Sequence, residues 1–246
     1  MHTWAFAIGG PVSDARLARY DLVVLDGEST PAARVARLRG EGKLVLAYLD
    51  AGTIERGRGW FPRAKRYRLD YWPDWGEWYA EVSAPGYRAL VGGVARSFLA
   101  KGFDGLFLDN VDMVETHPAQ RAGMTALVRS LASLVHGRGG FLFAQNGEDA
   151  IGPLVRWLDG WNREDVTGTY DFAAKRYVAV PAADRAAALA ALRRMRAKGL
   201  LALATDYLPA GRSTAAAVAA ACRAGALPFV GDVELTRVPA RPLRCP

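Results

Sequence analysis

Carboxylates end several apolar segments of the chain, where a buried acid is costly unless it is paired or takes part in a reaction. The segment GLFLDNVD, residues 105–112, leads from an apolar stretch directly into Asp109, and the segment LDGWNRE ends in Glu164. Hydrolysis of a glycosidic bond needs two such groups, one protonated as general acid and one ionised as nucleophile or base. Whether the two acids meet depends on the elements that carry them.

Eight β-rich segments alternate with helical patterns along the chain. The predicted strands cover residues 4–8, 22–26, 44–50, 105–109, 141–146, 158–164, 200–206 and 227–232. Near-continuous apolar strands separated by helices predict a parallel (β/α)8 barrel of the TIM type, formed by residues 1–246 as a single domain. Because few residues follow the last strand, we expect the final helix to be short or missing. An open doubly wound sheet is the alternative.

The carboxyl ends of barrel strands meet at one rim, where the active sites of this fold are built. Six of the eight predicted strands end in a carboxylate. One Asp at a strand end is commonly a helix cap, but acids around one rim repel one another unless a cation, a metal or a reaction uses them. The candidate strand-end residues are Asp26, Asp50, Asp109, Asn146, Glu164, Asp206 and Asp232.

Other kinds of site find little support. The patterns G-x-G-x-x-G and G-x-x-x-x-G-K-[ST] of nucleotide sites are absent, as is the nucleophile elbow G-x-S-x-G. No predicted strand end carries histidine, which barrel metallohydrolases usually recruit. We therefore expect no metal and no cofactor, while an all-oxygen Mg²⁺ or Ca²⁺ site stays open.

Composition and charge limit the partners. The net charge is +7, but Lys and Arg are spread through helical patterns, and an acidic rim would repel a phosphate backbone, so we expect no nucleic-acid partner. No apolar run is long enough for a membrane span, and no signal-peptide pattern opens the chain. Cys222 and Cys245 match no metal spacing and are either bonded to each other or idle. We expect the chain to be a monomer.

Residues 51–83, between the third and fourth predicted strands, form an unusually long connection that holds four of the seven tryptophans. A long loop at the active rim of a barrel is normally functional. Flat aromatic faces stack on pyranose rings, so we expect one or two of these side chains to face substrate, with Trp60 and Trp75 as the candidates. The remaining rings would form a small core that holds the loop.

Seven segments, taken in their order along the chain, are similar to one known family. They read YDLVVLD, VLAYLDAG, GFDGLFLDNVD, AQNGED, LDGWNRED, ATDY and LPFVGDVEL. Together they resemble glycoside hydrolase family 114, the endo-α-1,4-polygalactosaminidase family, over roughly residues 4–238. The chain departs from the family pattern at the third strand, which reads YLDAGTIE where many relatives resemble YxSxGE.

The resemblance implies an endo-acting, retaining barrel hydrolase that cleaves α-1,4-linked, galactosamine-containing exopolysaccharide, in an extracellular or periplasmic location. It implies a catalytic Asp and Glu, which by motif are Asp109 and Glu164. We expect Asp109 to be ionised and to attack or stabilise the anomeric carbon. Glu164, with a pKa raised by neighbouring carboxylates and aromatic walls, would protonate the leaving oxygen, although the two roles could be exchanged.

Further residues would bind the substrate, with acids pairing with the free ammonium groups of a partly de-N-acetylated galactosamine polymer. The expected substrate-binding residues are Asp26, Tyr48, Asp50, Asn110, Asp112, Asn146, Asp206, Tyr207, Trp60 and Trp75. We expect Glu148 and Asp165, just past their strands, to be helix-start acids. A barrel that binds polysaccharide without cutting it and an oxygen-ligated metal-dependent hydrolase are the alternative functions.

Overall fold

Eight parallel strands form the central sheet of the protein, whose computed structural model describes residues 1–246. In sheet order they are β1 (Trp4–Ala7), β2 (Leu22–Asp26), β3 (Leu44–Asp50), β7 (Gly105–Asp109), β8 (Phe141–Gln145), β9 (Gly160–Arg163), β12 (Leu201–Tyr207) and β13 (Leu227–Gly231). Each predicted strand is confirmed, with its ends shifted by two residues at most.

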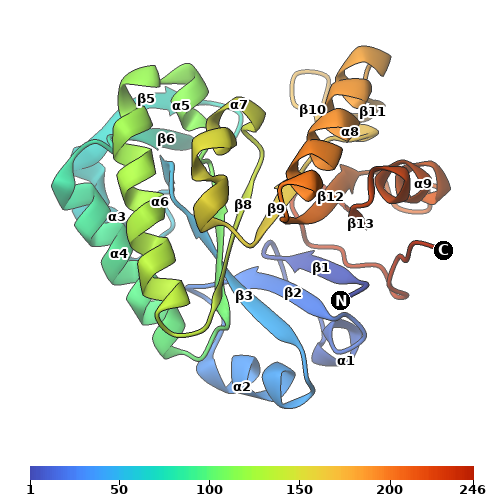
Figure 1. Cartoon of the computed structure of the whole chain (residues 1–246), viewed down its shortest axis with the longest axis horizontal. Helices are drawn as coiled ribbons and strands as arrows, with labels where there is room; N and C mark the ends of the chain where they lie inside the picture. Colours follow the sequence, from blue (N-terminus) through green and yellow to red (C-terminus); the bar gives the residue numbers. More distant parts are fainter.

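The sheet curls until its first and last strands, β1 and β13, lie side by side (Figure 1). No backbone ladder joins them. Instead, the Trp4 indole N–H donates to the Leu227 carbonyl at 2.9 Å, and the Gly9 N–H donates to the Leu235 carbonyl at 3.3 Å. The predicted (β/α)8 barrel is therefore confirmed, with a seam at which closure depends on side chains and on the chain after β13.

Aromatic side chains fill the barrel interior. The ring centroids of Trp4 and Phe229 are 5.4 Å apart, and those of Phe6 and Phe107 are 4.9 Å apart. All four side chains are fully buried, which explains why these strands read as nearly continuous apolar runs. Glycine makes room where the packing is closest: a Cβ atom on Gly160 would lie 2.2 Å from the Phe143 ring.

Helices cover the outside of the sheet. They follow the strands in chain order as α1 (Asp14–Leu17), α2 (Ala32–Gly40), α4 (Pro85–Ala100), α6 (Arg121–His136), α7 (Glu148–Ile151) with the 3-10 helix η3 (Gly152–Trp157), α8 (Ala182–Ala197) and α9 (Ala215–Ala224). In α6, Met124, Leu127, Val128 and Leu131 are buried at the spacing of one helix face. No helix follows β13, as expected from the short remaining chain. None of the helices combines the length and apolar character needed to cross a bilayer.

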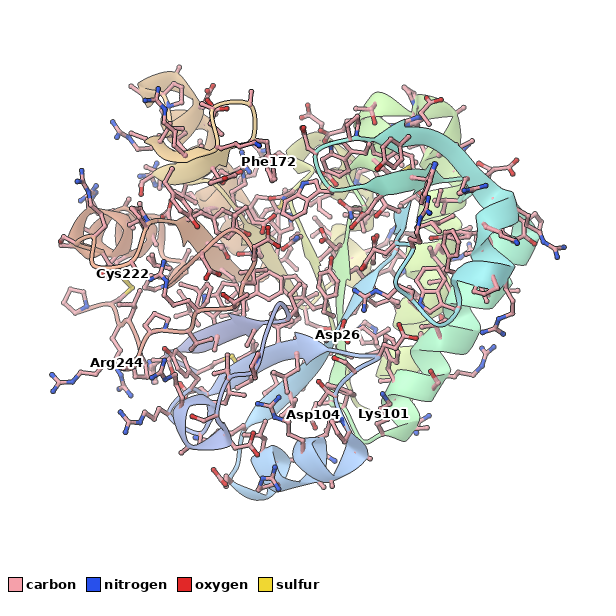
Figure 2. The ribbon with its side chains drawn as sticks, turned by 180° about the vertical axis from the view of Figure 1, so that it is seen from behind. Asp26, Lys101, Asp104, Phe172, Cys222 and Arg244 are labelled. Carbon is pink, nitrogen blue, oxygen red and sulfur yellow. A yellow bond between two sulfur atoms is a disulfide. The ribbon has the colours of Figure 1, made fainter.

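The segment after β13 runs beside the seam instead of forming a helix. The Tyr20 hydroxyl donates to the Pro239 carbonyl at 2.6 Å, and Arg16 donates to the Val238 carbonyl at 3.1 Å. A disulfide between Cys222 in α9 and Cys245 fixes the end of the segment, in the region labelled by Cys222 and Arg244 in Figure 2. The two cysteines are therefore bonded.

Two antiparallel hairpins rise at the rim. Residues 51–83, expected to be a loop, fold into a small sheet of β4 (Thr53–Ile54), β6 (Glu77–Ala80) and β5 (Arg68–Trp72), with α3 (Phe61–Ala64) and η1 (Lys65–Tyr67) before β5. After β9, β10 (Gly168–Asp171) pairs with β11 (Arg176–Ala179). The short helix α5 (Met113–Thr116) and the 3-10 helix η2 (Pro118–Gln120) lie between β7 and α6. The second hairpin has no counterpart in the sequence prediction.

Candidate active site

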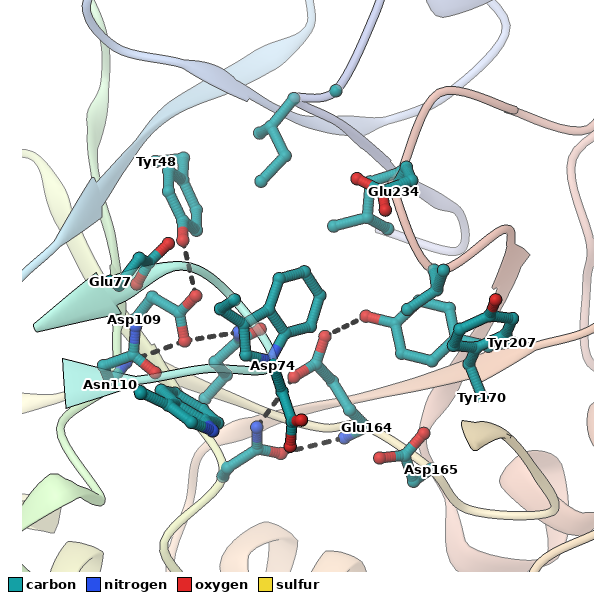
Figure 3. A pocket seen from close by; sticks show the side chains of 18 of the residues that line it. Tyr48, Asp74, Glu77, Asp109, Asn110, Glu164, Asp165, Tyr170, Tyr207 and Glu234 are labelled. Atoms are coloured by element: carbon teal, nitrogen blue, oxygen red, sulfur yellow. Dashed lines mark hydrogen bonds between the residues drawn. The ribbon is translucent and has the colours of Figure 1, made fainter. Parts of the chain in front are cut away.

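A cavity of about 610 Å³ opens at the carboxyl ends of the barrel strands. Its wall combines the ends of β3, β7, β8, β9 and β12 with residues of both rim hairpins. Asp109 and Glu164 project into it from the strand ends (Figure 3). The cavity therefore has the position at which barrel enzymes build their active sites.

Asp109, the last residue of β7, is held by three hydrogen-bond donors. Its carboxylate accepts from the Tyr48 hydroxyl at 2.5 Å, from the Gln145 amide at 2.6 Å and from the Asn110 backbone N–H at 2.7 Å. Burial and the nearby charge of Asp50 raise the pKa of Asp109 to about 6, although the three donors favour its ionised form. At neutral pH the group is thus mostly ionised.

A buried chain of polar side chains orients the Gln145 donor. Thr205 donates to the Asn162 side-chain oxygen at 3.0 Å, and Asn162 donates to the Gln145 side-chain oxygen at 3.1 Å. Thr205 and Asn162 are fully buried, and each uses the other as a partner. Since the Gln145 oxygen is occupied, its N–H₂ group is the one turned toward Asp109.

Glu164, the residue after β9, has two side-chain partners. It accepts from the Tyr207 hydroxyl and from the Asn146 amide, the latter at 2.7 Å, while the Glu164 backbone N–H donates back to the Asn146 side-chain oxygen at 3.1 Å. Burial, followed by the charges of Asp109 and Asp165, raises the pKa of Glu164 to about 8. At neutral pH Glu164 is mostly protonated, so the two acids hold different protonation states.

Both strand-end asparagines adopt the left-handed backbone conformation, each with φ near 55°. Asn tolerates this region better than most residues, which lets the chain turn sharply after β7 and β8. Asn146 thereby reaches Glu164, and the Asn110 side chain donates to Asp50 at 3.2 Å and to the Thr53 hydroxyl at 3.1 Å. The turn after β8 therefore supplies a partner to Glu164, and the turn after β7 links the end of the Asp109 strand to Asp50 and Thr53.

A second group of acids lies beside Asp109. Asp50, Glu55 and Glu77 each place one carboxylate oxygen within 4.8 Å of the others, an arrangement that could hold a divalent cation. The Thr53 hydroxyl already bridges Asp50 and Glu77. Burial and the charge of Asp50 raise the pKa of Glu77 to about 9 and that of Glu55 to about 7, so protons relieve part of the repulsion.

The structure brings six of the expected substrate-binding residues to the wall of the same cavity. They are Tyr48, Asn110, Asp112, Asn146, Tyr207 and Trp75. The pKa of Asp112 is raised to about 7 by its burial and by the charge of Asp109. The direct contact of these residues with a substrate stays a prediction.

Asp26 and Asp50 do not line the cavity, contrary to expectation, because local groups bind their carboxylates. Asp26 forms an ion pair with Arg58 and accepts the Ser29 backbone N–H at 2.6 Å. Asp50, only 2% exposed, accepts the Thr53 backbone N–H at 2.9 Å. Both act as caps of the chain that follows their strands, and Asp50 influences the site through its charge.

Asp206 and Trp60 also lie away from the cavity. Asp206 accepts the backbone N–H groups of Thr167 and Gly168, the second at 2.7 Å, so it holds the start of β10. Trp60 is 4% exposed and belongs to the hydrophobic core. Its indole has no free face to offer a sugar.

Acids near the other strand ends differ in role. Asp232 accepts the Thr236 backbone N–H at 2.7 Å and closes a turn. Glu148 lies in the first turn of α7, as expected, and pairs with Arg163 at 2.5 Å. Asp165 starts no helix: it has a left-handed backbone with φ near 54° and lines the cavity, so that expectation is wrong.

Several residues of the cavity wall were not expected from the sequence. Glu77 comes from β6, and Tyr170 and Phe172 come from the β10–β11 hairpin. None of them follows a barrel strand, so the pattern of acids at strand ends does not indicate them. Gln145 differs, because it directly precedes the candidate Asn146 and carries the amide that binds Asp109.

A parallel barrel with an ionised Asp and a protonated Glu at its active rim, flanked by aromatic side chains, is the architecture of a glycoside hydrolase. The sequence comparison agrees. The chain belongs to glycoside-hydrolase family GH114, whose family model matches residues 1–238.

Known proteins are similar to this chain in sequence or in fold. The glycoside hydrolase domain of PelA from Pseudomonas aeruginosa superposes with a TM-score of 0.83 at 27% identity, covering 96% of each chain. Aspergillus fumigatus Ega3, whose structure was determined in complex with galactosamine, superposes with a TM-score of 0.77 at 19% identity over 99% of this chain and 95% of Ega3. An uncharacterised protein of Deinococcus radiodurans is 30% identical, covering 89% of this chain and 75% of its own.

Proposed function

We propose that this glycoside hydrolase cleaves α-1,4-linked, galactosamine-containing exopolysaccharide as an endo-acting, retaining enzyme. Membership in family GH114 supports the substrate class, and galactosamine is the ligand of the similarly folded Ega3. The observation that carries the mechanism is the placement of two buried acids in one cavity, each with its own donors, in surroundings that raise the pKa of Asp109 to about 6 and that of Glu164 to about 8.

In the first step of the proposed reaction, Glu164 gives its proton to the glycosidic oxygen while Asp109 attacks the anomeric carbon. The bond to the leaving sugar breaks, and a covalent bond between the sugar and Asp109 forms. In the second step the Glu164 carboxylate takes a proton from water, and the resulting hydroxide displaces Asp109. Both acids return to their starting states, and the product keeps the anomeric configuration.

The charge of the cavity wall supports a cationic substrate. Asp112 and Glu77 have pKa values raised to about 7 and about 9 because they are buried among other acids. An ammonium group placed among them would favour their ionised forms and gain charge-assisted hydrogen bonds. Free amino groups of a partly de-N-acetylated polymer would supply such a charge.

Two conservative variants test the catalytic pair. Asp109→Asn and Glu164→Gln should each lower the release of reducing ends from a partly de-N-acetylated α-1,4-galactosamine polymer by about 10²- to 10⁴-fold. Glu41→Gln, which changes an exposed acid after α2, serves as the matched control and should keep full activity. A variant of Asp109 or Glu164 that folds and stays within tenfold of the wild type would remove that residue from the mechanism.

A metal-dependent hydrolase is the second candidate, favoured by the proximity of the Asp50, Glu55 and Glu77 oxygens. Incubation with EDTA separates the two mechanisms. The Asp109 and Glu164 mechanism predicts unchanged release of reducing ends, whereas loss of activity that Mg²⁺ or Ca²⁺ restores would assign a catalytic role to this second group of acids. A polysaccharide-binding barrel without activity would release no reducing ends in either condition.

We also propose an extracellular or periplasmic location. The disulfide between Cys222 and Cys245 supports it, because disulfides persist in oxidising compartments and are rare in the cytosol. Fractionation of the producing cells tests this location directly. The expected monomer stays a prediction.

A further inference from the structure

Aromatic rings from the two rim hairpins meet above the cavity. Trp75 lies in the turn between β5 and β6, Phe172 lies in the turn between β10 and β11, and their ring centroids are 5.0 Å apart with the planes inclined at 65°. Figure 2 shows Phe172 on the side of its hairpin that faces the neighbouring one. The contact joins residues 97 positions apart in the chain.

The β5–β6 hairpin holds its ring in place through further aromatic contacts. Trp72 stacks on Tyr79 at 5.4 Å with nearly parallel planes, and Trp72 also meets Trp75 edge-on at 6.4 Å. Tyr79 in turn contacts the His117 ring at 4.5 Å. Trp75 is therefore carried by a packed row of side chains.

The β10–β11 hairpin is built in the same way. Tyr170 contacts Phe172 at 5.2 Å and Tyr177 at 5.1 Å, and the Tyr177 hydroxyl accepts the Val233 backbone N–H at 3.3 Å. The six rings form one continuous row, here named the aromatic arch: Tyr79, Trp72, Trp75, Phe172, Tyr170 and Tyr177. Four of them, Trp72, Trp75, Tyr170 and Phe172, line the cavity.

The arch is weakest at its centre. No hydrogen bond and no ion pair joins residues 68–80 to residues 168–179, and the Trp75–Phe172 contact is the one aromatic ring contact between the two hairpins. Trp75 is also 41% exposed, whereas the rings behind it are more deeply packed. The arch can therefore part at this contact while each hairpin keeps its own packing.

We propose that the Trp75–Phe172 contact is a clasp over the cleft: it opens to admit an internal stretch of polysaccharide and closes over the bound chain. This inference depends on the proposed cleavage of a polysaccharide. A stretch without free ends cannot enter beneath joined rings unless the rings separate, and a chain lying beneath them leaves only after they separate again. The closed clasp thus retains the polymer between cuts, so one encounter yields several short products.

The distribution of products tests the clasp. The wild type and each variant are compared after they have produced the same small number of new reducing ends. The measured quantity is the ratio of short soluble oligosaccharides to total new reducing ends from a galactosamine polymer. Trp75→Ala and Phe172→Ala should each lower this ratio by about two- to tenfold, the equilibrium factor of one aromatic contact. The double variant should lower it no further, because both rings act through the same contact.

Matched variants separate the clasp from a general loss of packing. Tyr71→Ala removes an exposed ring of the same hairpin that does not line the cavity, and it should give the wild-type ratio. Trp75→Phe keeps a ring at the contact and should keep most of the wild-type ratio of short oligosaccharides to new reducing ends.

Two outcomes for the active enzyme overturn the clasp. The first is an unchanged ratio in both alanine variants. The second is an additive fall in the double variant, which would make the rings two separate platforms for sugars. A wild-type enzyme that releases no reducing ends from any galactosamine polymer would instead overturn the proposed function, and the clasp with it.

Discussion

At the scale of single residues, the site depends on how its hydroxyl donors are distributed. Tyr48 donates to Asp109, and Tyr207 donates to Glu164. Burial raises the pKa of both tyrosines well above the ordinary value of the phenol, so each stays a donor throughout the working range of the enzyme. Glu164 nevertheless keeps its proton to higher pH than Asp109 does, because its burial and the charges of Asp109 and Asp165 raise its pKa to about 8.

The two acids predict a bell-shaped dependence of kcat/KM on pH. Activity should rise as pH passes about 6, where Asp109 loses its proton, and fall above about 8, where Glu164 loses its own. The limbs belong to the coupled pair, and a profile of initial rates between pH 4 and pH 10 measures them. An alkaline limb near pH 5 would contradict the assignment of Glu164 as the acid.

Removing each tyrosine hydroxyl should move one limb. Both hydroxyls favour the ionised form of their partner, so Tyr48→Phe raises the pKa of Asp109 and shifts the acid limb upward, while Tyr207→Phe raises the pKa of Glu164 and shifts the alkaline limb upward. Tyr170→Phe, which alters a cavity hydroxyl bonded to neither acid, is the control and should move neither limb.

At the scale of elements, the sequence predicted the barrel strands better than the connections between them. Eight apolar runs of strand length leave little choice of partner, and parallel pairing aligns their carboxyl ends. The rim hairpins contain more polar and half-exposed strands whose partners lie within the insertions, so no strong apolar run marks them. The Trp75–Phe172 contact joins two such insertions, and no local pattern connects them.

The same limit explains which site residues could be predicted. Asp109 and Asp206 both end predicted apolar strands, yet Asp109 lines the cavity, whereas Asp206 binds the backbone N–H groups of Thr167 and Gly168. Successive side chains of a strand point to opposite faces, so a shift of one position decides between these roles. Strand ends in a sequence are uncertain by more than one position, and family resemblance therefore selected Asp109 and Glu164 where periodicity alone could not.

Asp206 gives an element-scale prediction about the β10–β11 hairpin. Asp206→Ala leaves the partly buried N–H of Thr167 and the buried N–H of Gly168 without their acceptor, and the free energy of unfolding should fall by about 2 to 4 kcal/mol. Asp206→Asn keeps one carbonyl oxygen as acceptor and should cost less. Urea unfolding measures both variants, and faster amide hydrogen exchange confined to residues 167–180 would locate the change. Equal stability of all three proteins would contradict this role.

At the scale of the whole molecule, closure of the barrel depends on its two chain ends. The segment after β13 lies against the turn that follows α1: the Tyr20 hydroxyl donates to the Pro239 carbonyl at 2.6 Å, and Arg19 donates to the Ala240 carbonyl at 3.0 Å. These contacts join the turn after the first helix to the last residues across the seam between β1 and β13, where no backbone ladder exists. The disulfide from Cys222 to Cys245 fixes the far end of the same segment.

Loss of this disulfide should therefore destabilise the protein without altering its catalytic pair. The bond spans 23 positions of sequence, and a loop of this size contributes about 3 kcal/mol by restricting the unfolded chain. Thermal unfolding should show a lower Tm for the Cys222→Ser, Cys245→Ser double variant, and dithiothreitol should lower the Tm of the wild type toward the same value. The reductant should leave the Tm of the double variant unchanged, because no other cysteine exists.

Both cysteines lie outside the cavity wall. At temperatures below unfolding, the pH limbs assigned to Asp109 and Glu164 should therefore be the same in the double variant as in the wild type. If neither the substitution nor the reductant changes the Tm, the contacts of Tyr20 and Arg19 hold the seam without the disulfide.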